Sequence, residues 1–153
     1  MKKLLTLFIT VSLLLGLASP CSIKAAEVDT EIIYLEDGDY IEIIVETAPQ
    51  ARVSGVKTAT KTATCRNSSD EALWSVSVTG TFVYVKDTSC VCTDVSGKSE
   101  CYNSVWKVSD VTTSKSGNTA TAKATGTKYF LGIAMHSYEL PVIMVCDTYG
   151  NIS

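Results

Sequence analysis

Residues 74–84 read WSVSVTGTFVY, and this stretch decides the fold class. Its apolar side chains share one parity along the chain: Trp74, Val76, Val78, Phe82 and Tyr84. Serine and threonine hold the other parity as far as Thr81. An alternation of period two that is rich in valine, aromatic residues and threonine is typical of a strand with one buried face. Gly80 interrupts the apolar face, which predicts a bulge, a bend or the close approach of another backbone.

The same alternation recurs on both sides of this strand. Threonine occupies every second position of 58–64, and alanine occupies every second position of 120–124. Alanines on an inward face leave room for large side chains, so we expect Trp74 and Trp106 to pack there. The predicted core consists of Trp74, Val76, Val78, Phe82 and Trp106. Further strands are predicted at 40–47, 90–95, 105–111, 129–135 and 140–146.

Short turn sequences separate these segments, at 36–39, 67–70, 86–88, 96–97 and 116–118. Many short strands at such spacing predict an all-β fold, a single antiparallel β-sandwich of about seven to nine strands. The pattern leaves room for a helical turn only around 68–73. Pro141 cannot donate a hydrogen bond to a neighbouring strand, so the last strand is expected to begin at a sheet edge.

The N-terminus carries the features of an export signal. Lys2 and Lys3 precede an apolar stretch at 4–18, and small residues follow as far as Ala26. This order is typical of a cleaved secretory signal peptide, and the apolar stretch is too short to span a membrane. We therefore expect a secreted, extracellular protein. Its expected parts are a signal peptide at 1–26, an acidic N-terminal strand or arm at 27–50, joined by a linker at 47–56, and a β-sandwich body at 51–153.

Charge is unevenly placed along the chain, whose formal net charge is −3. Segment 27–50 carries eight acidic residues and no basic residue. Nucleic acid and an anionic membrane surface would both be repelled by such a segment, so neither is an expected partner. The segment is either a solvated edge strand or an arm that docks on a basic partner.

The cysteines suggest disulfides. Cys21 is expected to leave with the signal peptide, and five cysteines remain: Cys65, Cys90, Cys92, Cys101 and Cys146. In an exported chain these are expected to pair, with one left over. Cys90 and Cys92 cannot easily bridge each other, because two residues along a strand lie near the upper limit of disulfide reach. If 96–97 is a tight hairpin, Cys101 lies opposite both, which makes Cys90–Cys101 a candidate bridge and Cys92–Cys101 its competitor.

Several short motifs of the body carry a resemblance to a known family. They are Arg66-Asn67-Ser68-Ser69, Ala72-Leu73-Trp74, Val78-Thr79-Gly80-Thr81-Phe82, Cys92-Thr93, Ser104-Val105-Trp106 and Ser114-Lys115-Ser116-Gly117-Asn118. From about residue 57 to residue 153 the chain is similar to a family of small secreted all-β proteins of Gram-positive, often gut-dwelling, bacteria, catalogued as a domain of unknown function. The resemblance implies export, an all-β fold and a disulfide between the recurring positions Cys92 and Cys146. It implies no activity.

Residues that could perform catalysis do not converge. His136 is the one histidine of the chain, and no G-x-S-x-G segment accompanies it. Glu42 and Glu46 are separated by roughly 13 Å along a strand, which is too far for a glycosidase pair. Cys90 and Cys92 have no histidine nearby to complete a zinc site. We expect no catalytic residue, no metal site and no cofactor.

The threonine rows are the one surface feature that suggests a function. Threonines on adjacent strands present methyl and hydroxyl groups at sheet spacing, which could match a polysaccharide or another repetitive surface, although threonine is also a good exposed strand residue. Tyrosines that could stack on sugars are Tyr34, Tyr40, Tyr102, Tyr138 and Tyr149. We expect a non-catalytic extracellular binding or interaction module whose surface ligand is an unknown polysaccharide or protein. The alternatives are a secreted hydrolase-like enzyme that uses His136 and a secreted effector that acts on neighbouring cells.

Overall fold

The computed structural model describes residues 28–35, 38–47 and 54–153. The signal peptide expected at 1–26 and most of the linker expected at 47–56 lie outside these residues. Within them the chain forms nine strands and no helix. No helix in this part of the chain is long and apolar enough to cross a membrane.

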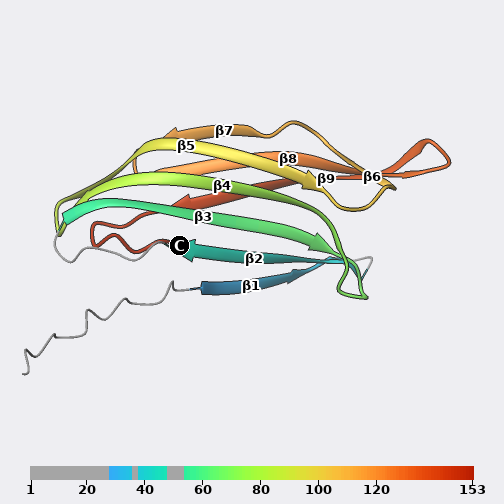
Figure 1. Cartoon of the computed structure of the whole chain (residues 1–153), viewed down its shortest axis with the longest axis horizontal. Coiled ribbons are helices and arrows are strands. Elements are labelled where there is room, and N and C mark those ends of the chain that lie inside the picture. The colour runs from blue at the N-terminus through green and yellow to red at the C-terminus, as the bar shows by residue number, and fades with distance from the viewer. Residues whose placement is uncertain (1–27, 36–37, 48–53) are drawn as a thin grey trace, which may run out of the picture.

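The strands form two antiparallel sheets that stack as two layers of long, gently curved strands (Figure 1). The five-stranded sheet follows chain order, with β1 (Val28–Tyr34), β2 (Tyr40–Thr47), β3 (Ser54–Arg66), β4 (Ala72–Val85) and β5 (Ser89–Cys101). In the four-stranded sheet β9 (Ile133–Val145) pairs with one edge of β8 (Thr119–Phe130), while β6 (Trp106–Val108) and β7 (Thr112–Ser116) pair with the other. The predicted all-β sandwich is confirmed.

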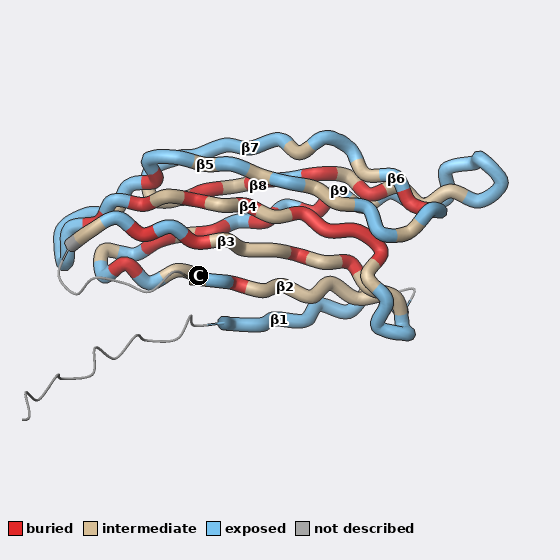
Figure 2. Tube along the Cα trace, viewed as in Figure 1, coloured by how far each residue is buried: buried red, intermediate tan, exposed pale blue. Residues whose placement is uncertain are grey.

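The core lies between the two sheets, where alternate residues of β3, β4, β8 and β9 meet (Figure 2). Trp74, Val76, Val78 and Phe82 are at most 1% exposed, and Trp106 is 3% exposed. All five belong to one buried cluster with the alanines of β8 and the apolar residues at the end of β9: Ala120, Ala122, Ala124, Leu140, Val142 and Met144. The inward parity read from 74–84 is therefore the parity that is buried.

Trp74 fills the space between the sheets because the residues opposite it are small. A Cβ on Gly126 of β8 would lie 2.6 Å from Cζ2 of the Trp74 indole. The rings of Trp74 and Trp106 have centroids 6.1 Å apart. Neither buried indole N–H has a hydrogen-bond partner among the described residues. Close packing, and not hydrogen bonding, therefore holds the two indoles in position.

Gly80 lies at a close contact between the sheets, which is made by side chains and not by another backbone. A Cβ at this position would lie 2.9 Å from Cε of Met144 on β9. The register between β4 and β5 also shifts just after it, between Thr81 and Phe82. The side chain of Met144 occupies the space that the missing Cβ leaves.

The turn predicted at 96–97 is wrong, because β5 continues through Gly97 to Cys101. A Cβ on Gly97 would lie 2.7 Å from Cγ2 of Thr113 and 3.1 Å from Cγ2 of Val111. The glycine therefore serves the close packing of β5 against the segment that leads into β7. In a sequence, a glycine after a serine indicates a turn. Here the glycine is needed instead because side chains of a neighbouring segment pack closely against it.

Three other local predictions need correction. Segment 129–135 is not one strand, since β8 ends at Phe130 and β9 begins at Ile133, with Leu131 and Gly132 at positive φ in the turn between them. Segment 105–111 contains only the short strand β6. Segment 68–73 contains no helix, since a turn at 68–69 is followed by the start of β4 at Ala72. Each of these segments carries apolar residues that look like part of a regular element but lie in or beside a turn.

The acidic N-terminal segment and the last strand both lie at a sheet edge. Segment 27–50 contributes the hairpin of β1 and β2, and every described residue of β1 is exposed at the edge of the five-stranded sheet. The N–H of Leu35 donates to the carbonyl of Asp39 at 2.8 Å, which closes the hairpin next to Gly38 at φ 86°. Pro141 lies opposite Lys123 on β9, which pairs only with β8 and is an edge strand, although β9 begins at Ile133 and not at 140 as predicted.

The fit of Trp74 against Gly126 generates a stability prediction. Gly126→Ala should lower the free energy of unfolding by about 3 kcal/mol, because the new methyl group overlaps a rigid, buried indole. Gly55→Ala is the matched control, since a Cβ there would lie 3.7 Å from Oη of Tyr84, an ordinary contact. That variant should change the free energy by no more than about 0.5 kcal/mol. Equal losses for the two variants in urea unfolding would contradict this description of the core.

Candidate binding surface

The outer face of β3 and β4 carries two rows of hydroxyl side chains in register, which we call the hydroxyl ladder. Its cross-strand pairs are Thr58 with Thr81, Thr60 with Thr79, Thr62 with Ser77, and Thr64 with Ser75. The residues between them, such as Ala59, Ala63 and Val78, are buried between the sheets. Because side chains alternate along a strand, the ladder faces away from the core, and each of its residues except the buried Ser75 is at least partly exposed.

The ladder is a regular array. Neighbouring strands are about 4.8 Å apart and every second residue along a strand is roughly 6.7 Å apart. The hydroxyl oxygens of Thr58 and Thr81 lie 3.1 Å apart, and those of Thr60 and Thr79 lie 2.9 Å apart. One O–H donor is used within each such pair, so a second donor and several acceptor lone pairs remain for a ligand.

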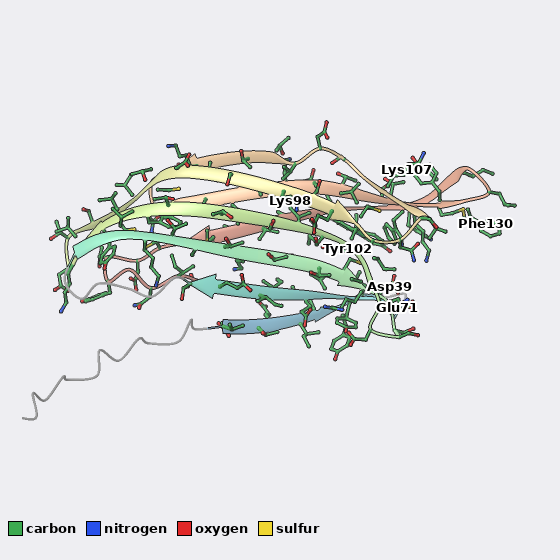
Figure 3. All side chains as sticks on the ribbon, in the orientation of Figure 1. Asp39, Glu71, Lys98, Tyr102, Lys107 and Phe130 are labelled. Atoms are coloured by element: carbon green, nitrogen blue, oxygen red, sulfur yellow. The ribbon has the colours of Figure 1, made fainter. Side chains whose placement is uncertain are left out.

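Tyr102 lies at one end of the ladder, just beyond β5 (Figure 3). Its backbone N–H donates to the carbonyl of Leu73 at 2.9 Å, and its hydroxyl donates to Oε2 of Glu100 at 2.6 Å. Oγ of Ser75 lies 3.0 Å from the same hydroxyl oxygen and can donate to it. Tyr102 remains 53% exposed beside the hydroxyl groups. Tyr102 is therefore held both by its backbone and by its hydroxyl group.

Glu100 links Tyr102 to Lys98. The ion pair with Lys98 and then the hydrogen bond from Tyr102 lower the pKa of the Glu100 carboxyl. The same carboxylate raises the pKa of the Tyr102 hydroxyl, because it accepts the proton that ionisation would remove. The carboxylate stays charged and the phenol stays neutral around pH 7, so this end of the surface presents a neutral hydroxyl and a paired charge.

A second polar cluster borders the ladder on β2 and β3. Nε of Arg66 donates to Oε2 of Glu42 at 2.8 Å, and Nη1 donates to the carbonyl of Asp70 at 3.0 Å. The bond to Glu42 raises the pKa of the guanidinium. Tyr40 donates to the Asp70 carboxylate, and its ring lies 6.0 Å from that of Tyr34. Two tyrosine rings therefore stand on the β1–β2 side of the ladder.

The five tyrosines named from the sequence thus separate into two groups. Tyr34, Tyr40 and Tyr102 border the outer face of the five-stranded sheet. Tyr138 stacks beside Trp106, with ring centroids 6.2 Å apart. Tyr149 hydrogen-bonds to Asp87 in the turn between β4 and β5. The first three are the ones placed to contact a ligand on the ladder.

The residues tested for catalysis stay apart. His136 is exposed on β9, and its cross-strand partner is Lys128, a base and not an orienting carboxylate. Glu42 is held by Arg66, while Glu46 is exposed next to Thr60. No group of three or more His, Cys, Asp or Glu side chains in the described ranges could hold a metal ion. The surface that these ranges present is suited to binding through hydrogen bonds and ring stacking.

An open groove of about 470 Å³ lies on the inner side of β1 and β2. It is lined by Asp29, Val45, Lys57 and the C-terminal residues Asn151 and Ile152, among others. Nζ of Lys57 donates to the carbonyl of Gly150 at 2.8 Å. The groove thus combines one acidic side chain with a lysine that already holds the C-terminal segment.

The predicted disulfides are absent, since all five described cysteines are free thiols. Cys90 and Cys101 lie near the two ends of the same strand, roughly 36 Å apart by the rise per residue, so the predicted bridges of Cys101 to Cys90 or to Cys92 are wrong. Cys92 and Cys146 are both buried, but the Cys92 thiol donates to the carbonyl of Asp94 at 3.2 Å. Cys146 instead shares a side-chain hydrogen bond with Cys90.

Sequence reasoning found the threonines of β3 but could not assign them partners on β4, because the register of two strands is a tertiary property. It also missed the links that hold the bordering side chains, namely Arg66 to Glu42 and Tyr102 to Ser75. The one available signal was the shared outward parity of 75–81 and 58–64, which places both rows on solvent-facing positions. No protein-family model, curated protein or solved structure matches the chain.

The link between Glu100 and Tyr102 generates a pH prediction. Since the folded-state pKa of Tyr102 is raised, this contact stabilises the fold below the ordinary tyrosine pKa near 10, and the contribution is lost as pH rises through the raised value. Glu100→Gln should bring one tyrosine back toward its ordinary pKa in an absorbance titration. Glu139→Gln, which removes the carboxylate paired with Lys123 on the other sheet, is the control and should leave the tyrosine titration unchanged. An unchanged titration in Glu100→Gln would contradict the contact.

Proposed function

We propose that this protein is a secreted, non-catalytic binding module whose hydroxyl ladder and bordering tyrosines bind a repetitive neutral polysaccharide. The observation that carries the proposal is the in-register pairing of the two hydroxyl rows on the outer face of the five-stranded sheet, which is partly exposed, with Tyr102 fixed at one end. Export rests on the signal-like N-terminus, and the family resemblance of the body is part of the same proposal.

The chemistry of a polysaccharide fits this surface. Sugar hydroxyls are donors and acceptors like those of threonine, and the apolar faces of sugar rings stack on exposed tyrosine rings. A chain with a regular repeat can contact several ladder positions at once, so that individually weak contacts add. Four of the charged groups that border the ladder form ion pairs, Arg66 with Glu42 and Lys98 with Glu100.

The charge of the surroundings favours a neutral polymer over an anionic one. Glu46 is exposed next to Thr60, and the segment 27–50 carries no basic residue. A polyanion such as teichoic acid would be repelled here, whereas an uncharged glucan or chitin would not. This choice distinguishes the proposal from general adhesion to cell walls.

Binding of the mature chain to insoluble cellulose, chitin and peptidoglycan stripped of teichoic acid tests the proposal. Thr60→Val with Thr79→Val keeps side-chain shape and removes two hydroxyls at the centre of the ladder. We expect this double variant to weaken binding about 5- to 30-fold, as the loss of roughly 1–2 kcal/mol of hydrogen bonding requires. The free energy of unfolding should change by less than about 1 kcal/mol, because both hydroxyls lie on the outer face.

The other sheet supplies a matched control. Thr121 and Thr125 occupy the outer face of β8, where the opposite residues on β9 are Ile143 and Glu139. Thr121→Val with Thr125→Val changes the same chemistry on the opposite side of the sandwich and should leave binding unchanged. Equal weakening by both double variants, or retention of none of the three polymers by the wild-type chain, would contradict the proposal.

A secreted effector that acts on neighbouring cells is a second candidate, favoured by the tip of the β8–β9 hairpin. The tip extends beyond the body of the sandwich (Figure 3) and exposes apolar side chains, with Leu131 87% exposed and Phe130 and Ile133 also exposed. Exposed apolar clusters of this kind mark contact surfaces.

A single substitution separates the two candidates. Leu131→Asp should abolish binding to intact bacterial cells if the tip makes the contact, and it should leave binding to isolated polysaccharide intact. If the hydroxyl ladder alone is responsible, cell binding by Leu131→Asp will equal that of the wild type and will be lost in Thr60→Val with Thr79→Val.

A further inference from the structure

The two sheets bring a pair of thiols together at the end of the sandwich opposite Tyr102. Cys90 lies at the start of β5, and Cys146 directly follows β9. Cys146 is fully buried, and Cys90 is half-buried against the core cluster. The two side chains share a hydrogen bond. They therefore come from different sheets and meet in the interior.

The alignment of β9 on β4 explains why these two positions meet. Gly126, which pairs with Tyr138, touches Trp74, and Met144 touches the position of Gly80. The strands thus advance together, six residues in each, and by the same count Cys146 falls level with Phe82 on β4. Cys92 and Cys90 are the β5 partners of Phe82 and Tyr84. Both cysteines of β5 are close to this level, and only Cys90 shares a side-chain hydrogen bond with Cys146.

The backbone around Cys146 is held by the hairpin between β7 and β8. The N–H of Cys146 donates to the carbonyl of Asn118 at 3.0 Å, and Nδ2 of Asn118 donates to the carbonyl of Cys146 at 2.7 Å. The N–H of Cys92 donates to the carbonyl of the adjacent Gly117 at 2.8 Å. The same turn therefore fixes the end of β9 against β5, so the thiols meet without rearrangement of either sheet.

We propose that Cys90 and Cys146 form a disulfide that joins the two sheets when the protein meets a disulfide oxidant. Cys90 and not Cys92 is the partner, because Cys146 interacts through its side chain with Cys90, whereas the Cys92 thiol donates to the carbonyl of Asp94; the Cys146 thiol also donates to the carbonyl of Asp147 at 3.5 Å. A small-molecule disulfide such as oxidised glutathione is the oxidant. The half-exposed Cys90 thiolate attacks one sulfur of it, which forms a mixed disulfide and releases one thiolate.

Cys146 then completes the bridge. It loses its proton to solvent, and its thiolate attacks the Cys90 sulfur of the mixed disulfide, which releases the second glutathione thiolate. Two thiols are oxidised and one disulfide is reduced to two thiols. Burial, the hydrogen bond with Cys90 and the charge of Asp147 raise the pKa of Cys146 to about 12, while Lys57 opposes the shift. The closing step should therefore accelerate as pH rises from 7 toward 10.

Non-reducing peptide mapping of the mature chain after incubation with oxidised glutathione tests the bridge. Cleavage after Lys86, Lys98 and Lys128 leaves Cys90 and Cys92 together in 87–98 and Cys146 in 129–153. Fragmentation between Cys90 and Cys92 assigns the linked residue. We expect Cys90 linked to Cys146. A bridge from Cys92 to Cys146, or two free peptides under oxidising conditions, would overturn the proposal.

Matched variants give a second readout. Oxidation of the wild type should raise Tm by roughly 10 °C or more, since the bridge closes a loop of about 55 residues. Cys90→Ser should abolish this shift, and the neighbouring Cys92→Ser should retain it. Cys90 is only half-buried, so its variant is expected to fold and keep the comparison valid. A shift lost in Cys92→Ser and kept in Cys90→Ser would contradict the assignment.

Discussion

The packing of the Trp74 indole against Gly126 is the contact on which the rest of the structure depends. It sets the distance between the sheets at one end, and Met144 against Gly80 sets it further along. Both contacts require a glycine on one side and a large side chain on the other. They fix β4 over β8 and β9 in one register, because a slip of one residue would bring a Cβ into the ring or turn the apolar face outward.

The outer surface follows from this register. Once Val76 and Val78 face the core, Ser77 and Thr79 must face solvent, and pairing with β3 places Thr62 and Thr60 beside them. The hydroxyl ladder is thus the outward half of the strands whose inward half forms the core. The same alignment brings the start of β5 to the end of β9. One packing constraint therefore underlies both the proposed binding surface and the proposed bridge between Cys90 and Cys146.

The sequence was sufficient for what depends on local alternation and insufficient for what depends on contact between distant segments. The strand at 74–84 and its buried parity are local properties. Gly97 shows the opposite case, since a glycine that looks like a turn residue lies within a strand because Thr113 approaches it. The error at Gly97 led directly to the wrong partner for Cys90, since a turn there would have folded Cys101 back upon it. The pairs Arg66–Glu42 and Tyr102–Ser75 likewise join segments whose proximity no local pattern records.

Oxidative footprinting of the mature chain, free and bound to cellulose or chitin particles, tests the central claim most directly. The side chains of Tyr102 and Tyr34 are exposed at the border of the ladder, and those of Ile143 and Met135 are exposed on β9 of the other sheet. All four should be labelled in the free protein. The account predicts that the bound polymer protects the two tyrosines and leaves Ile143 and Met135 unchanged. Protection of Ile143 and Met135 with undiminished labelling of Tyr102 would place the ligand on the other sheet and contradict the account.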